Sequence, residues 1–196
     1  MLWRLLVILT VCSPGPVLAH GEQSLISSLN EGILTGLSAI PQQLMLVTLG
    51  LILGRQNLGQ DKIFAITFCI AMASGGIVAN YFPASNLELL VLTTTAVMSL
   101  VLAATSRLPA SFCVLLTLSG GAVAGSTLPS LIQTGHAQLS YKVGVVLGLI
   151  LPIVYATLIA AFFNKRVWQQ IGVRVIGSWI TAVCCMMGAL VLKSAY

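Results

Sequence analysis

Long apolar stretches separated by short polar segments dominate the chain after residue 31. Such stretches occupy 33–54, 63–82, 87–106, 109–127, 143–163 and 175–192. Each is long enough to cross about 30 Å of hydrocarbon as an α-helix. Helix is the expected form, because lipid offers no hydrogen-bond partner to an open backbone. The pattern therefore predicts an all-α integral membrane protein with six transmembrane helices in one domain, residues 33–196.

The first residues follow a different pattern, typical of a secretory signal peptide. Arg4 precedes a short apolar run from Leu5 to Cys12, and prolines then interrupt it. A spanning helix needs about 20 apolar residues, and this run is shorter. Val17 and Ala19 stand where a signal peptidase requires small residues. We expect residues 1–19 to be a signal peptide and 20–32 to be an extracytoplasmic N-terminal segment that begins at His20.

Composition supports a membrane protein, and the distribution of basic residues predicts its orientation in the membrane. The chain is 58% hydrophobic and 7% charged, with a mean hydropathy of +1.03, whereas soluble domains carry about 25% charged residues. The net charge of +5 is spread along the chain, which gives no sign of nucleic-acid binding. Lys142 and Lys193 fall on one side of the predicted spans. On the other side fall Arg55, Lys62, Arg107, Lys165, Arg166 and Arg174. Because basic residues concentrate in the cytoplasm, both termini of the mature chain should be periplasmic, in a bacterial inner membrane.

Glycines recur at a spacing that allows helices to pack closely. Small residues four apart let two helix backbones approach in a membrane. The pairs are Gly32/Gly36, Gly50/Gly54, Gly121/Gly125 and Gly144/Gly148. Two segments also resemble each other, "FCIAMASGGIVANYFP" (68–83) and "FCVLLTLSGGAVAGSTLP" (112–129). Besides the lipid bilayer, such faces suit a homo-oligomer or the subunits of a membrane complex.

Few polar residues lie within the spans, and these are the candidates for a solute path. Pro41 frees a backbone carbonyl, which the amides of Gln42 and Gln43 could satisfy, or they could meet a substrate. Alternatively, the span begins near Pro41 and 32–40 is interfacial. Glu88 opens the third span, where a carboxylate can cap the positive helix end or meet a cation. With Thr35, these residues form the predicted transport path.

Metal chemistry has one further candidate, at the N-terminus. If cleavage occurs, the free amino group and the Nδ1 atom of His20 can chelate a divalent metal, and Glu22 can add an oxygen; imidazole suits nickel, copper and zinc. The run "CCMM" (184–187) suggests Cu(I), but consecutive residues point around the helix and do not face one ion. No nucleotide-binding, nucleophile-elbow or metalloprotease motif is present, so no enzyme is predicted.

The layout resembles the HupE/UreJ family of hydrogenase- and urease-linked membrane proteins, regarded as nickel or cobalt permeases. The family's first span opens with His-Pro-Leu-x-Gly-x-Asp-His, and the matching stretch is "TGLSAIPQQLMLVTLG" (35–50). Leu37 and Gly50 fit this pattern. Thr35 and Gly36 stand in place of His-Pro, and Pro41 and Gln42 in place of Asp-His.

The family's second motif, His-Gly-x-Ala-His-Gly-x-Glu-Leu-Pro, matches "GGAVAGSTLP" (120–129). Here Gly120, Ala124 and Thr127 replace the two histidines and the glutamate. The resemblance implies a permease with nickel or cobalt as its transient cargo and no resident cofactor. The missing imidazoles and carboxylates leave open an accessory or structural subunit that retains the fold without transport.

Overall fold

A computed structural model of the chain describes residues 25–56, 61–78, 84–105, 108–128, 136–163 and 167–194. Within these ranges every regular element is an α-helix, which confirms the predicted all-α class. The helices are α2 (Leu25–Ser38), α3 (Ile40–Gln56), α4 (Asp61–Val78), α5 (Ala84–Ala104), α6 (Ala110–Ser126), α7 (His136–Phe162) and α8 (Val167–Ser194). The expected signal peptide and the candidate ligands His20 and Glu22 lie outside the described residues.

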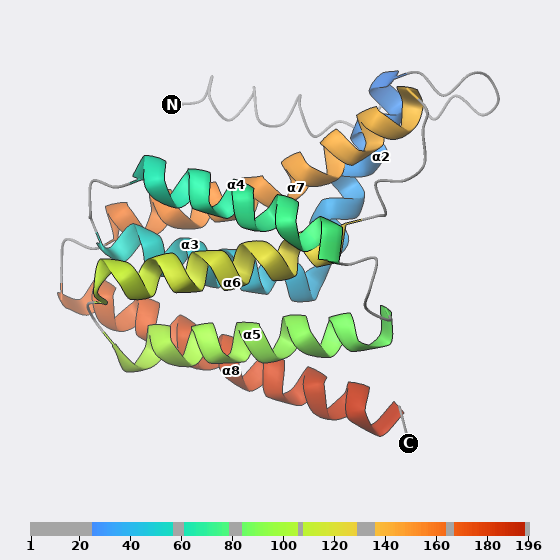
Figure 1. Cartoon of the computed structure of the whole chain (residues 1–196). Coiled ribbons are helices and arrows are strands. Elements are labelled where there is room, and N and C mark those ends of the chain that lie inside the picture. The colour runs from blue at the N-terminus through green and yellow to red at the C-terminus, as the bar shows by residue number, and fades with distance from the viewer. Residues whose placement is uncertain are drawn as a thin grey trace, which may run out of the picture.

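Helices α3 to α8 lie side by side and run in alternating directions along the chain (Figure 1). Helix α3 is central and contacts α5, α6, α7 and α8, while α4 packs mainly on α6, and α5 on α8. The described helical parts of the two similar segments, 68–78 and 112–126, thus belong to neighbouring helices, α4 and α6. Helix α2 packs on the first half of α7, beyond one end of the other helices.

The sequence treats 33–54 as one span, but the structure divides this stretch into two helices. Helices α2 and α3 meet at Ala39 with a bend of 76°. Pro41 is the second residue of α3, a position where its missing N–H and fixed φ do little harm. The expected boundary between residues 32 and 33 also falls inside α2. The structure shows a helix that starts next to Pro41, while residues 32–38 belong to the preceding helix α2.

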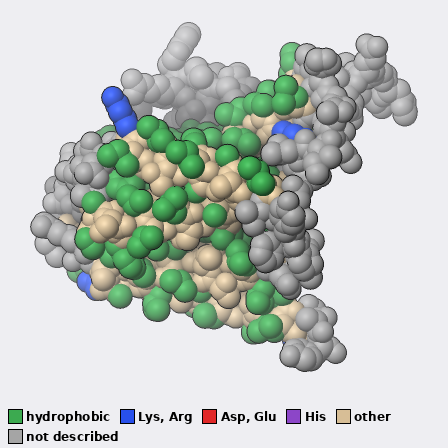
Figure 2. All heavy atoms as spheres, viewed as in Figure 1, with side chains coloured by type: hydrophobic (Ala, Val, Ile, Leu, Met, Phe, Trp, Pro, Cys, Tyr) green, Lys and Arg blue, Asp and Glu red, His purple; other side chains and the backbone are tan. Residues whose placement is uncertain are grey.

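Three of the described helices are long and apolar enough to cross a membrane. They contain the segments Leu87–Ala104, Leu139–Phe162 and Trp168–Lys193, and the bent α2–α3 pair qualifies as a fourth crossing. The apolar parts of α4 and α6 are shorter, Lys62–Ile77 and Ala110–Ser126. Large hydrophobic side chains such as Ile70, Leu115 and Trp179 are exposed. Figure 2 shows apolar side chains across the viewed face, with Lys and Arg confined to its margins. The described surface therefore suits lipid.

Glycines lie at the closest approaches between helices. A Cβ atom on Gly50 of α3 would lie 2.6 Å from the Ile153 oxygen of α7 and 2.7 Å from the Ala156 Cβ. On Gly121 of α6 it would lie 2.8 Å from the Ala71 Cβ of α4. Gly36, Gly125 and Gly144 likewise lie against the backbone of α7, α4 and α2 respectively. Side chains at these positions would push the helices apart.

Polar contacts also join α5 to its neighbours. The Arg55 Nη1 atom donates to the Leu102 oxygen at 3.2 Å, and the Arg174 Nε atom donates to the Ala103 oxygen at 2.8 Å. Because the last carbonyls of a helix lack partners within the helix, these two arginines hydrogen-bond the end of α5. Farther along α5, the hydroxyls of Ser99 and Thr181 are 2.7 Å apart. Helix α5 is thus tied to both α3 and α8.

Candidate functional site

A polar cavity of about 330 Å³ lies where α3 and α5 begin and α6 ends. Helices α3 and α5 run in the same direction and α6 runs opposite to them, so these three helix ends meet (Figure 1). Its lining residues are Pro41, Gln42, Leu87, Glu88, Val91 and Thr127. The structure therefore brings together Gln42 and Glu88, two of the four predicted path residues.

The polar side chains of this cavity come from three helices. Gln42 is the third residue of α3 and is partly buried, whereas Glu88 is exposed. Glu88 is the fifth residue of α5, whose first turn holds no acidic residue, so its carboxylate lies beyond the first-turn N–H groups that a cap would bind. Thr127 follows the end of α6, and its hydroxyl donates to the Ala124 oxygen at 2.8 Å. An amide, a carboxylate and a hydroxyl thus line one opening.

Gln43 has a different position from its neighbour Gln42. Consecutive helical residues point about 100° apart, and the Gln43 Nε2 atom donates to the Gly36 oxygen at 2.7 Å. The same nitrogen lies 3.5 Å from the Gly148 oxygen of α7. Gly36 is in the last turn of α2, whose carbonyls need partners from outside the helix. The Gln43 side chain therefore bridges the bend between α2 and α3 by donating to the Gly36 carbonyl.

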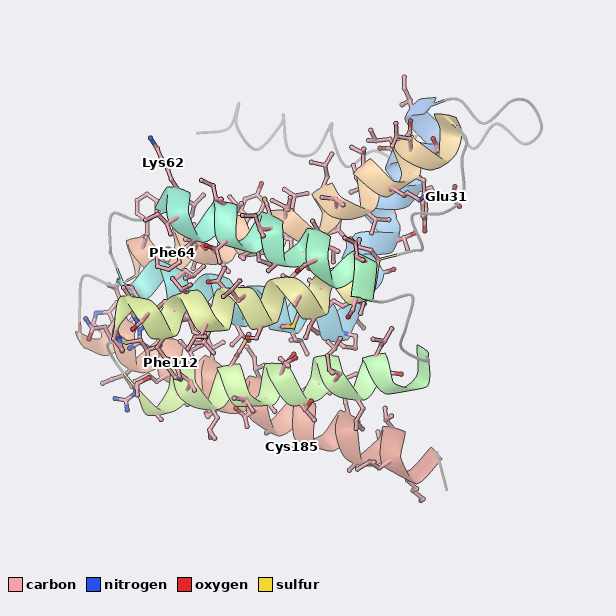
Figure 3. The ribbon with its side chains drawn as sticks, viewed as in Figure 1. Glu31, Lys62, Phe64, Phe112 and Cys185 are labelled. Atoms are coloured by element: carbon pink, nitrogen blue, oxygen red, sulfur yellow. The ribbon has the colours of Figure 1, made fainter. Side chains whose placement is uncertain are left out.

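Thr35 does not line the cavity. It is exposed on α2, and its hydroxyl donates to the Glu31 oxygen one turn earlier at 2.9 Å. Figure 3 places Glu31 on α2, where that helix runs alongside α7. Thr35 thus hydrogen-bonds within its own helix and is separate from Gln42 and Glu88.

Buried apolar side chains follow Gln42 and Glu88 along α3 and α5. Along α3, Met45 and Leu49 share a helix face with Gln42 at spacings of three and seven residues, and both are fully buried. Along α5, Val91 and Met98 share the face of Glu88 and are 2% and 1% exposed. We call Met45, Leu49, Val91 and Met98 the apolar floor. Its four members belong to one buried core cluster.

The stretch that matches the second family motif, 120–129, contacts the apolar floor from α6. Gly120, Ala124 and Thr127 are four and three residues apart, so they share one helix face. A Cβ atom on Gly120 would lie 3.2 Å from both the Leu49 Cδ2 and the Met98 Cε atoms, and Ala124 is fully buried. Two residues of the apolar floor, Leu49 and Met98, therefore occupy the space in front of Gly120, one of the two positions at which the family pattern has imidazole.

The donor set of the cavity is weak for a tightly bound transition metal. Within the described ranges, no group of three or more His, Cys, Asp or Glu side chains could hold a metal ion. The cavity supplies neutral oxygens from Gln42 and Thr127 and one carboxylate from Glu88. Oxygen ligands are hard, whereas nickel and cobalt favour imidazole. These residues fit transient contact with a hydrated divalent cation better than a resident metal.

The sulfur-containing residues of α8 do not gather at one point. Cys184 is buried and Cys185 is exposed, as expected for adjacent residues on a helix. Among the described cysteines, Cys69 is on α4 and Cys113 is on α6, and all are free thiols. The structure therefore gives no support to a copper site in "CCMM".

Sequence comparison gives one family. The family model described as "HupE / UreJ protein" matches residues 7–187, nearly the whole chain. Searches of curated proteins and of solved structures give no match.

Proposed function

Because the chain belongs to the HupE / UreJ family, which points to a membrane accessory or metal-transport role, we propose that it is an inner-membrane permease for a divalent transition-metal cation, nickel or cobalt. The carrying observation is the polar cavity. It joins Pro41 and Gln42, at the end of the first family motif, to Thr127, at the glutamate position of the second. These two stretches are far apart in sequence and share one opening, to which Glu88 adds a negative charge.

The proposal includes six spans, formed by α2–α3 as one bent crossing and by α4 to α8. Support comes from the alternating helix directions and from the positions of the charges. Arg55, Lys62 and Arg174 lie near one end of the helices, and Glu88 lies near the other. With basic residues in the cytoplasm, the polar cavity faces the periplasm. Cleavage after Ala19 places His20 and Glu22 on that side, where they could gather cations at the entrance.

Topology is tested with reporters fused after residues 58, 106, 132 and 196. Alkaline phosphatase requires the periplasm, and we expect activity only from the fusions at 132 and 196. N-terminal sequencing of the purified protein tests the signal peptide, and we expect His20 as the first residue. Phosphatase activity at 58 or 106 would contradict the orientation, and an intact Met1 would contradict the N-terminal chelate.

Transport is tested by cellular uptake of radioactive nickel and cobalt. Uptake should exceed that of cells with empty vector, and Glu88→Gln should lower it about ten-fold, since Glu88 is the one charged group among the described residues that line the cavity. Glu31→Gln is the matched control, because Glu31 is exposed on α2 and does not line the cavity. Uptake equal to that of empty vector, with the protein verified in the membrane, would refute the permease.

A second candidate function is a non-transporting accessory or structural subunit of a membrane complex. The apolar floor favours it, because Leu49 and Met98 fill the space in front of Gly120 and no described cluster holds a metal. This candidate predicts that a stable partner co-purifies in mild detergent from the native membrane. Recovery of the chain alone or only as a homo-oligomer, together with measurable cation uptake, would exclude it.

A further inference from the structure

A second cavity, also of about 330 Å³, lies between the end of α3, the first half of α4 and the second half of α7. We call it the apolar groove. Phe64 and Phe68 of α4 and Ile153 of α7 are among its lining residues. These segments lie toward the end of the bundle that carries Lys62, so the groove and the polar cavity belong to opposite halves of the protein.

The groove offers no strong polar group to an occupant. Among the described lining residues Thr157 contributes the one hydroxyl, and that hydroxyl donates to the Ile153 oxygen at 2.7 Å. Cys69 adds a thiol, which is only a weak hydrogen-bond donor. Water or a polar ligand would lose hydrogen bonds on entering such a space. The chemistry of the lining therefore selects a hydrocarbon occupant.

The helix packing explains why this space stays open. Gly50 and Gly54 let α7 approach α3 closely, and α4 packs instead on α6. Helix α4 therefore makes little direct contact with either α3 or α7. Ala65 and Cys69 of α4 and Val154 of α7 are exposed along the gap, so the groove opens to the outside of the bundle.

A positive charge lies at one end of the groove. Lys62 is three residues before Ala65 and seven before Cys69, so the three share a face of α4. Lys62 is exposed, and Figure 3 shows it extending from the first turn of α4. From Lys62 to Cys69 the helix rises about 10 Å. The ammonium can therefore hold an anionic headgroup at the membrane surface while the attached chain runs inward along the groove.

We propose that the apolar groove binds one acyl chain of an anionic phospholipid of the cytoplasmic leaflet, with the phosphate held by Lys62. Basic residues beside a cavity between helices on the cytoplasmic side are the usual setting for anionic lipid recognition. This inference rests on the membrane orientation proposed above and not on metal transport. The metal-uptake assay and the lipid-binding assay therefore test the two proposals independently.

Native mass spectrometry of the full chain in detergent tests the site. Phosphatidylglycerol and phosphatidylcholine with identical acyl chains are added in equal amounts, and the retained lipids are counted. The wild type should retain phosphatidylglycerol in preference. Lys62→Gln should reduce that preference about five-fold, in line with one lysine at an anionic membrane surface. Lys193→Gln is the control, since it removes the same charge from the end of α8.

Ala65→Phe tests the groove itself, because it fills the space with a ring and leaves every charge in place. It should reduce binding of both lipids, while thermal unfolding in detergent without added lipid verifies that the variant is folded. Unchanged lipid retention in Ala65→Phe, or an unchanged preference in Lys62→Gln, would overturn the proposal. A dimer that Ala65→Phe dissociates, without bound lipid, would overturn it by assigning the groove to a second copy of the chain.

Discussion

Gly50→Ala is the sharpest test of how the helices are held together. The added Cβ atom would lie 2.6 Å from the Ile153 oxygen and 2.7 Å from the Ala156 Cβ. Carbon atoms pack best at about 3.5–4.0 Å, so α3 and α7 must separate by about 1 Å along this contact. The obstacle includes backbone, and a side-chain rotation therefore does not relieve it.

The expected change in the free energy of unfolding of Gly50→Ala follows from two opposing effects. Overpacking of this kind costs up to about 3 kcal/mol, and alanine in place of glycine within a helix returns about 1 kcal/mol. We expect a net loss of about 2 kcal/mol in the free energy of unfolding. For a chain of this size, this loss corresponds to a fall of about 4–8 °C in Tm.

Gly188→Ala is the matched control, because Gly188 lies inside α8 and nothing is within 4 Å of a Cβ atom placed there. It keeps the gain in helix propensity without the clash, so its Tm should not fall. Thermal unfolding in detergent can be followed with a thiol-reactive dye once the exposed Cys69 and Cys185 are replaced by serine, since Cys113 and Cys184 are buried. Equal Tm values for the two variants would refute the assigned contact between α3 and α7.

Three further predictions concern polar contacts between helices. Gln43→Leu leaves the last turn of α2 without its amide donor and should speed hydrogen exchange in α2, whereas Gln42→Leu should not. Equal exchange in the two variants would contradict the stabilising role of the hydrogen bond from Gln43 to Gly36. Ser99→Ala should lower the free energy of unfolding by about 0.6–1.7 kcal/mol, the range for hydrogen bonds between membrane helices, in the same dye assay. Arg174→Gln should speed exchange at the carboxyl end of α5, and Lys193→Gln, which removes a distant charge, should leave that end unchanged.

Hydropathy was sufficient for the fold class but not for the helix boundaries. The stretch 33–54 remains apolar across Ala39, and hydropathy does not register a change in backbone direction. Pro41 was the available signal, because proline is tolerated near the start of a helix and costly within it. The bend then depends on a contact distant in sequence, between the Gln43 side chain and the region of Gly148 on α7, which a local pattern does not contain.

The candidate site was also predicted only in part, because a local pattern does not show which side chains face one another in the folded protein. Gln42 was recognisable as a polar residue within the first apolar stretch, and Glu88 as a polar residue at the start of the third. Rotation about the helix axis decides which of two neighbours faces a cavity, and the weak amphipathicity of α3 gave no guide to separate Gln42 from Gln43. Thr127 had a signal in the family-like spacing of 120–129, but a threonine at a carboxylate position did not suggest a lining residue.

The hydrogen bonds that α5 makes with other helices become possible at different times during synthesis of the chain. Arg174 and its acceptor Ala103 are 71 residues apart, and Ser99 and Thr181 are 82 apart. At a synthesis rate of about 5–20 residues per second, the ribosome needs roughly 4–14 s after Ala103 to add Arg174. Arg55 is made before α5 and is already available to its carbonyls. A nascent chain that stalls before residue 174 therefore lacks the hydrogen bonds from Arg174 to the Ala103 and Ala104 carbonyls and the one between Ser99 and Thr181.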